Sequence, residues 1–212
     1  MQFLLAVITG VPMTLLLTIA GFAIGAVGGV PLALARRSKL WLPRAVARSI
    51  IELLRGIPPI VWIFAIYFGI GNGFLQVAPI PAAVAAFGVI SCAYMAEIYR
   101  GGLSGVPSGQ WEAGEALGLD HRSLLSRVIG PQVMRLSIPA AATYAIGLLK
   151  DTSIAYTIGV QEILFNADMQ AKQSANAIGP YLWAALVYVV ITIPCAWAAR
   201  SLDAKLRRKV AR

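Results

Sequence analysis

Residues 56–96 read GIPPIVWIFAIYFGIGNGFLQVAPIPAAVAAFGVISCAYMA and contain no charged side chain over 41 positions. A single helix of that length would reach about 60 Å, twice the hydrocarbon core of a bilayer, which is about 30 Å thick. The segment must therefore fold back once. Glycine at 69, 71 and 73 and proline at 79 and 81 mark the turn, so we expect spans over residues 57–75 and 81–99.

The rest of the chain repeats this apolar pattern. Residues 1–35 also lack Asp, Glu, Lys and Arg, and the whole chain is 58% hydrophobic but only 13% charged, against about 25% charged in soluble domains. Further spans are expected over residues 11–35, 137–160 and 179–199. The sequence thus predicts an all-α, polytopic membrane protein with about five transmembrane helices.

Lys and Arg set the expected orientation, because basic short loops stay in the cytoplasm. Of the 18 basic residues, 16 fall on one side of the predicted spans: Arg36, Arg37, Lys39, Arg44, Arg48, Arg55, Arg100, Arg122, Arg127, Arg135, Arg200, Lys205, Arg207, Arg208, Lys209 and Arg212. We therefore expect a periplasmic N-terminus and a basic cytoplasmic tail at residues 204–212. The retention of basic loops in the cytoplasm and their attraction to anionic lipid explain the net charge of +9. Nucleic-acid binding is not needed to explain it.

A long polar segment, residues 100–136, joins the third and fourth spans, and a connection of this length is expected to have structure of its own. Pro107 begins one short helix and Gly118 ends it. Asp120 is placed to cap a second helix, which Gly130-Pro131 would end. The first helix has no basic residue, and it is either a docking surface for another protein or an interfacial helix lying on lipid.

The residues of this segment resemble a known motif. Glu112-Ala113-Gly114, followed by Gly118, Val128 and Pro131, is similar to the cytoplasmic EAA loop of the permeases of ABC importers. Three positions depart from that pattern: Gly114 replaces Ala, Val128 replaces Ile and Gly130 replaces Leu.

Other motifs in the same order resemble the polar amino acid and opine branch of that family. They are Arg55-Gly56-Ile57-Pro58-Pro59, residues 93–102 (AYMAEIYRGG), Gly109-Gln110, Pro131-Gln132 and Leu149-Lys150-Asp151-Thr152-Ser153. The resemblance covers residues 11–203. It implies a type-1 (MetI-like) permease fold in the bacterial inner membrane, and a pathway for a polar amino acid or a related solute such as an opine.

The same resemblance implies which partners and residues act in coupling. Glu112, Ala113, Gly114, Gly118 and Pro131 would form the element that couples to an ATPase. The partners would be an ABC ATPase dimer holding ATP and Mg, a second permease subunit of the same or a related chain, a periplasmic solute-binding protein and membrane lipid. The polar outer loop, residues 161–179, is the candidate contact for the binding protein.

The chain itself shows no sign of enzymatic activity. None of its five lysines is followed by Ser or Thr, so it has no phosphate-binding loop. Its one histidine, His121, and its two cysteines, Cys92 and Cys195, form no metal or catalytic set. We therefore expect no catalytic residue, metal or cofactor in this chain.

Four charged residues are candidates for the solute path or its gate: Glu97, Arg100, Lys150 and Asp151. A charge inside a span costs roughly 2.5–3.5 kcal/mol, so Lys150 and Asp151 must face a partner or water. They either pair with another helix, for instance through Glu97 or Arg100, or line the path. The alternative function is a stand-alone channel or secondary transporter that uses Lys150 and Asp151.

Overall fold

The computed structural model describes residues 2–70, 77–174 and 176–210, and over these ranges the chain forms helices and no strand. The prediction of an all-α protein is confirmed. The helices are α1 (Gln2–Ile8), α2 (Val11–Arg36), α3 (Trp41–Gly56), α4 (Pro59–Phe64), α5 (Pro79–Ser104), α6 (Ser108–Ala116), α7 (His121–Ser123), α8 (Gly130–Asp151), α9 (Ile163–Gln173) and α10 (Gly179–Val210). Two π-helical segments, Ala65–Ile70 and Leu124–Ile129, follow α4 and α7, and a 3₁₀ segment, Thr152–Ile158, follows α8.

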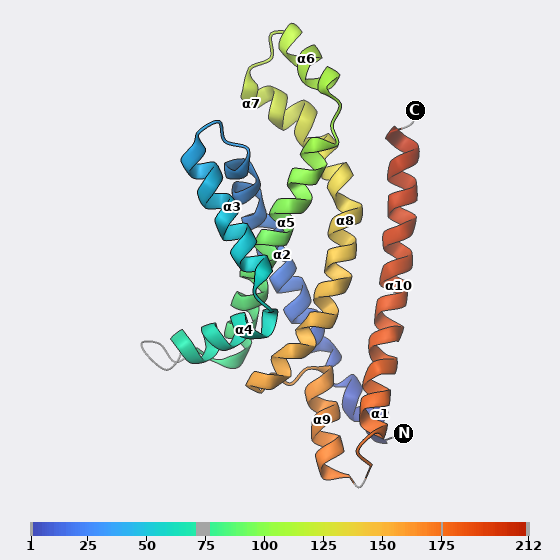
Figure 1. Cartoon of the computed structure of the whole chain (residues 1–212). Helices are drawn as coiled ribbons and strands as arrows, with labels where there is room; N and C mark the ends of the chain where they lie inside the picture. Colours follow the sequence, from blue (N-terminus) through green and yellow to red (C-terminus); the bar gives the residue numbers. More distant parts are fainter. Residues whose placement is uncertain (1, 71–76, 175, 211–212) are drawn as a thin grey trace.

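Three of these helical stretches are long and apolar enough to cross a membrane: residues 2–36, 79–104 and 179–201. A fourth candidate is the pair α3 and α4. Helix α8 runs beside α5 and α10 (Figure 1) but carries Arg135, Lys150 and Asp151. The N- and C-termini lie at opposite ends of the molecule (Figure 1).

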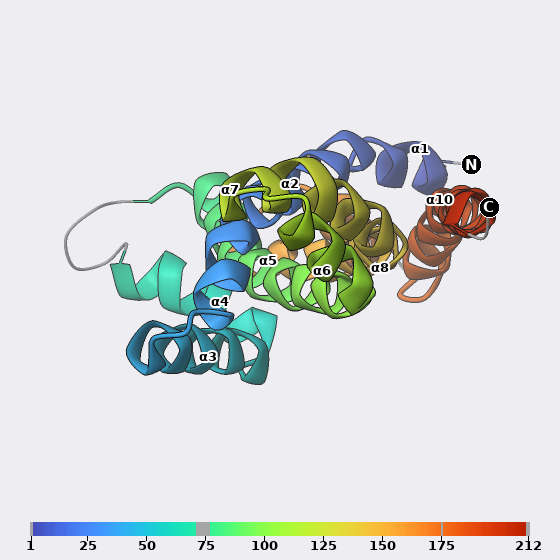
Figure 2. The same ribbon diagram turned by 90° about the horizontal axis from the view of Figure 1, so that it is seen from above.

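The contact between α2 and α5 forms the centre of the fold, and Figure 2 shows α5 with α2, α3 and α8 around it. Glycine recurs at every fourth position of α2, at Gly21, Gly25 and Gly29. A Cβ at Gly25 would lie 2.7 Å from the backbone carbonyl carbon of Ser91 in α5, so only glycine permits this approach. Lipid provides no hydrophobic driving force for the association of transmembrane helices. Close van der Waals packing of this kind stabilises the contact between α2 and α5 instead.

The second predicted span, residues 57–75, is helical from Pro59 to Ile70 within the described residues, and a helix that was not predicted precedes it. Residues 41–56, which were assigned to a cytoplasmic loop, form α3, and the chain then bends by 101° into α4. Pro58 and Pro59 cause the bend, because proline disfavours helical geometry in the residue before it and cannot donate its own hydrogen bond. The predicted break at residues 71–73 and the end of the span at 75 lie outside the described residues.

The fourth span also differs from its predicted range, 137–160. Helix α8 begins at Gly130 and ends at Asp151, and the chain turns at Gly159, whose φ is +85°. Gly130-Pro131 therefore does not end a helix, which corrects the prediction. The π-helical segment Leu124–Ile129 leads directly into α8, and this local widening accommodates a proline that has no N–H to donate.

Two further differences concern the C-terminal third. The polar outer loop predicted at residues 161–179 contains a helix, α9, which packs with α1 and α10 around Val7, Ile163 and Ala184. Helix α10 continues to Val210, so most of the predicted tail, residues 204–212, extends the last helix; Ala211 and Arg212 lie outside the described residues.

Candidate functional site

The segment that resembles a coupling loop forms a helical hairpin, which we define as residues 107–129. It consists of α6, a turn, and α7 with the π-helical segment, and it projects beyond the ends of α5 and α8 (Figure 1). It lies at the same end of the molecule as the C-terminus and as the connection from α2 to α3 (Figure 1). The hairpin is therefore a protrusion from the membrane-spanning body.

The turn of the hairpin is built as the sequence predicted. Helix α6 begins at Ser108 after Pro107, and Gly118 ends it with a φ of +72°, a conformation that glycine adopts without strain. Asp120 caps the second helix: its Oδ2 accepts the backbone N–H groups of Arg122 (3.1 Å) and Ser123 (3.2 Å). The hydrogen bonds from Ser123 hold the pKa of the Asp120 carboxyl below its ordinary value.

Gly114 holds the two helices of the hairpin together rather than offering a surface to a partner. It is buried, and a Cβ there would overlap the Cδ1 atom of Leu124, which is only 1% exposed. The N–H of Leu119 also donates to the Gly114 carbonyl, at 3.1 Å. Gly114 thus packs inside the hairpin, and its part in coupling to an ATPase stays a prediction.

Two side-chain contacts connect the hairpin to the body. The Arg37 guanidinium, just beyond α2, lies 5.3 Å from the ring centre of Trp111 in α6, a cation–π distance. The Gln132 side chain in α8 donates a hydrogen bond to the side-chain Oε1 of Gln110 at 3.1 Å. The hairpin thus contacts the residue that follows α2 and the first turn of α8.

The outward face of α6 remains available to a partner. Glu112 and Ala113 are exposed, as are Leu117, at 79%, and Gly118. This face combines acidic and small residues with one protruding leucine. Pro131 is exposed in the first turn of α8 and lies outside the hairpin.

Two of the four charged candidates for the solute path, Glu97 and Arg100, form a group of ion pairs with a third residue, Arg36. Glu97 in α5 forms ion pairs with Arg100 (2.8 Å) and with Arg36 at the end of α2 (2.9 Å). Glu97 and Arg100 are three residues apart and therefore neighbours on the surface of α5. Arg36 was not anticipated as a partner, because it is 61 positions away in the chain.

Lys150 and Asp151 lie elsewhere, at the end of α8, and both are exposed. Neither forms a salt bridge with any residue that the structure describes, and Glu97 pairs instead with Arg100 and Arg36. The expectation that Lys150 or Asp151 pairs with Glu97 or Arg100 is therefore wrong. The position of Lys150 and Asp151 on the solute path stays a prediction.

A column of aromatic side chains was missed as a candidate path feature. The Arg55 guanidinium at the bend of the second span lies 4.9 Å from the ring centre of Tyr94, and that ring stacks on Tyr144 at 4.8 Å. The Tyr144 hydroxyl in turn lies 2.8 Å from the Ser91 hydroxyl. The column joins α3, α5 and α8, and the only sequence signal for it was that Arg55 and Tyr94 both fall in family motifs.

At the opposite end of the molecule, Glu162 is not a surface residue of the outer loop. It is fully buried, caps α9 through a 2.7 Å hydrogen bond from the Phe165 N–H, and accepts the Tyr188 hydroxyl at 2.8 Å. Burial raises the pKa of its carboxyl. The exposed polar surface here is formed by α9, where Lys172 pairs with Asp168 at 2.5 Å.

Within the described residues no cluster of His, Cys, Asp and Glu could hold a metal ion. The described residues thus form a protruding hairpin at one end, and charged and aromatic groups along the helices.

Comparison with known proteins identifies a family and relatives whose sequences are similar to this chain. The family model described as "binding-protein-dependent transport system inner membrane component" matches residues 21–208. The chain is 36% identical over 189 residues to the probable amino-acid permease protein YxeN of Bacillus subtilis, covering 88% of this chain and 84% of that protein. It is 34% identical over 200 residues to the octopine transport system permease protein OccM of Rhizobium radiobacter, covering 90% and 81%.

Two solved structures have the same fold. The crystal structure of an amino acid ABC transporter with histidines matches with a TM-score of 0.88 and 32% identity, over 94% of each chain. The inward-facing methionine ABC transporter MetNI matches with a TM-score of 0.79 at 19% identity, over 94% of this chain and 95% of that one, which supports the fold alone. None of these matches supports the alternative of a stand-alone channel or secondary transporter.

Proposed function

Because the chain belongs to the family of inner membrane components of binding-protein-dependent transport systems, we propose that it is the permease subunit of an ATP-driven importer for a polar amino acid or an opine-like solute. Its relatives named for amino-acid and octopine transport support this solute class. The chain is a multi-pass membrane protein and a transport component rather than an enzyme.

The observation that carries the coupling role is the exposed face of α6 on a braced hairpin. Glu112, Ala113 and Gly118 would enter a groove of a cytoplasmic ATPase, which holds ATP and Mg. Gly114 would act indirectly by joining α6 to Leu124, and Pro131 by shaping the start of α8. Closure of an ATPase dimer would then move α2 and α8 through Trp111 and Gln110.

The solute would pass along the side of the helices that carries the Arg55–Tyr94–Tyr144 column. Lys150 and Asp151, exposed at the far end of α8, would offer counter-charges to the ammonium and carboxylate of an amino acid. The Arg36–Glu97–Arg100 triad would stabilise the inner end of the path as a gate. Breaking it would release the end of α2 that carries Arg36 from α5 during inward opening.

Each remaining partner would bind at a different part of the molecule. The hairpin and the basic segments would lie in the cytoplasm, with the C-terminus, and the N-terminus would be periplasmic. A periplasmic solute-binding protein would contact the end formed by α9, and a second permease subunit, a copy or a relative, would complete the pathway.

The test uses Ala113→Trp in the assembled transporter. Ala113 is exposed, so the bulky ring disturbs nothing within the chain but obstructs docking. We expect less ATPase to co-purify with the permease, and solute-stimulated ATP hydrolysis to be lost. Ala204→Trp is the matched control, because Ala204 is an exposed alanine in the C-terminal part of α10, the helix whose C-terminal end lies at the same end of the molecule as the hairpin (Figure 1). Normal co-purification and stimulation with Ala113→Trp would refute docking at this face.

A further inference from the structure

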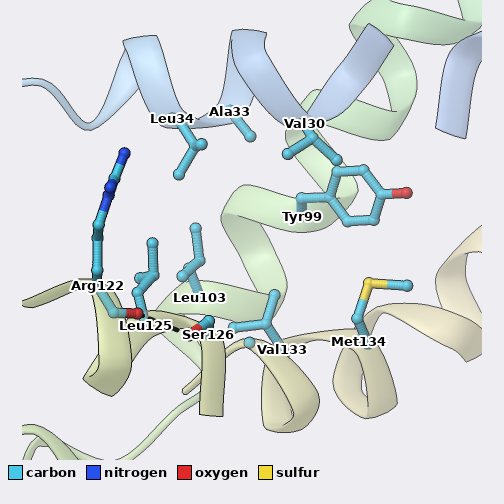
Figure 3. Close-up of a pocket in the computed structure, with 11 residues that line it drawn as sticks. Val30, Ala33, Leu34, Tyr99, Leu103, Arg122, Leu125, Ser126, Val133 and Met134 are labelled. Carbon is cyan, nitrogen blue, oxygen red and sulfur yellow. Dashed lines mark hydrogen bonds between the residues drawn. The ribbon is translucent and has the colours of Figure 1, made fainter. Parts of the chain in front are cut away.

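An apolar groove runs between α2 and the continuous helical stretch formed by the second helix of the hairpin and the start of α8, and Tyr99 and Leu103 of α5 also line it. Val30 and Leu34 of α2 face Leu125, Val133 and Met134 across it (Figure 3), and its volume is about 360 Å³. Almost all of the lining is apolar. The groove is separate from the outward face of α6 and from the charged and aromatic residues of the proposed path.

One end of the groove opens into a basic hollow. Arg122 stands at that end of the groove (Figure 3). The adjoining hollow shares Leu34 and Leu125 with the groove and is lined in addition by Arg37 and Lys39. No acidic residue of the described chain lines either cavity. Three basic residues, Arg37, Lys39 and Arg122, thus line the apolar groove or the hollow beside it.

The position of the groove indicates what it meets. It lies along the last two turns of α2, a helix apolar enough to span the membrane, at the end that carries the hairpin. The exposed fractions of Val30, Leu34 and Met134 are 43%, 47% and 50%. Exposing these apolar side chains to water costs free energy, whereas exposing them to lipid acyl chains does not. The basic hollow is then at the level of the lipid headgroups.

We propose that this groove binds an anionic phospholipid of the inner leaflet, with one acyl chain between Val30 and Met134 and its phosphate at Arg37, Lys39 and Arg122. A phosphate accepts charge-assisted hydrogen bonds from such side chains, and basic pockets between helices at this membrane face suit anionic headgroups. The lipid would bridge α2 and the hairpin, and so stabilise the pair of elements through which coupling movements pass.

The experiment places the whole transporter in nanodiscs of phosphatidylcholine with a trace of phosphatidylglycerol whose acyl chain carries a diazirine. After illumination, labelled peptides are mapped by mass spectrometry. We expect label concentrated on residues 30–34 and 133–134, and Arg122→Gln to lower it about fivefold, the effect of one basic side chain worth about 1 kcal/mol at an anionic lipid surface. Arg127→Gln is the matched control, because Arg127 is exposed on the same helical segment and lines neither cavity.

A second variant fills the groove without changing charge: Leu34→Trp should exclude the acyl chain and abolish the local label. Unlabelled phosphatidylglycerol should compete, whereas inorganic phosphate should not. The proposal is overturned by equal labelling with a phosphatidylcholine analogue, by label spread evenly over the outer surface, by equal effects of Arg122→Gln and Arg127→Gln, by displacement with inorganic phosphate, or by a crosslink showing the second permease subunit in the groove.

Discussion

The packing of Gly114 against Leu124 predicts that the effect of a methyl group at position 114 reverses sign with the residue at position 124. In the native chain, Gly114→Ala forces its Cβ against the buried Leu124 side chain, and overpacking of this kind costs about 1–3 kcal/mol. That cost exceeds the gain of about 1 kcal/mol in helix propensity, so the substitution should loosen the hairpin.

The reference background for this comparison is Leu124→Ala. This substitution alone leaves a cavity and should cost about 2–5 kcal/mol, enough to open the hairpin locally. In the Leu124→Ala background the same Gly114→Ala change meets free space and keeps its helix-propensity gain, so it should restore about 1 kcal/mol.

The assay is amide hydrogen exchange over residues 108–124 of the purified transporter, which reports the free energy of local opening. The native chain, both single variants and the double variant are compared as a double-mutant cycle. If Gly114→Ala changes the opening free energy equally in both backgrounds, within about 0.5 kcal/mol, then the two residues are not packed together and the hairpin is not braced as described.

Three further predictions concern the rest of the molecule. Burial raises the pKa of the Glu162 carboxyl above 4.5 in the folded chain. The protonated carboxyl therefore contributes stability at low pH, and this contribution is lost as the pH rises through the folded pKa. Glu162→Gln should flatten this part of the plot of thermal stability against pH, and an unchanged slope would exclude Glu162 as its source. Arg55→Gln removes the cation–π contact with Tyr94 and should slow solute uptake several-fold while the ATPase still co-purifies; unaltered uptake into proteoliposomes would remove the column from the path. Gly25→Leu should prevent the close approach of α2 and α5, so that the protein no longer elutes as a monodisperse gel-filtration peak. Gly101→Leu is the control and should preserve that peak, because no atom lies within 4 Å of a Cβ placed at Gly101. Equal behaviour of the two variants would contradict the packing described.

The sequence was most informative where one strong local rule decided the structure. Charge-free runs located α2, α5 and the apolar part of α10 because burying charge in lipid is costly. The turn of the hairpin followed from the chemistry of single residues, an αL glycine at Gly118 and a helix cap at Asp120. Elements of this kind depend little on distant parts of the chain.

The errors arose where tertiary contacts override local signals. Helix α3 escaped a hydropathy reading because Arg44, Arg48, Glu52 and Arg55 lie on one face of it, while Ile51 and Leu54 on another face are buried. The change from α8 to a 3₁₀ segment after Asp151 occurs without Gly or Pro until Gly159. The ion pair of Arg36 with Glu97 depends on the approach of α2 and α5, which spacing along the chain does not reveal.

Docking of the hairpin is tested most directly by a photo-crosslinker, p-benzoylphenylalanine, placed at Ala113 in membranes of cells that express the whole transporter. Illumination should join the permease to a protein that mass spectrometry identifies as an ATPase with a phosphate-binding loop, and the adduct should be absent with the crosslinker at Ala204. An adduct with lipid alone at Ala113, or an equal yield of the ATPase adduct at Ala204, would contradict coupling through this face.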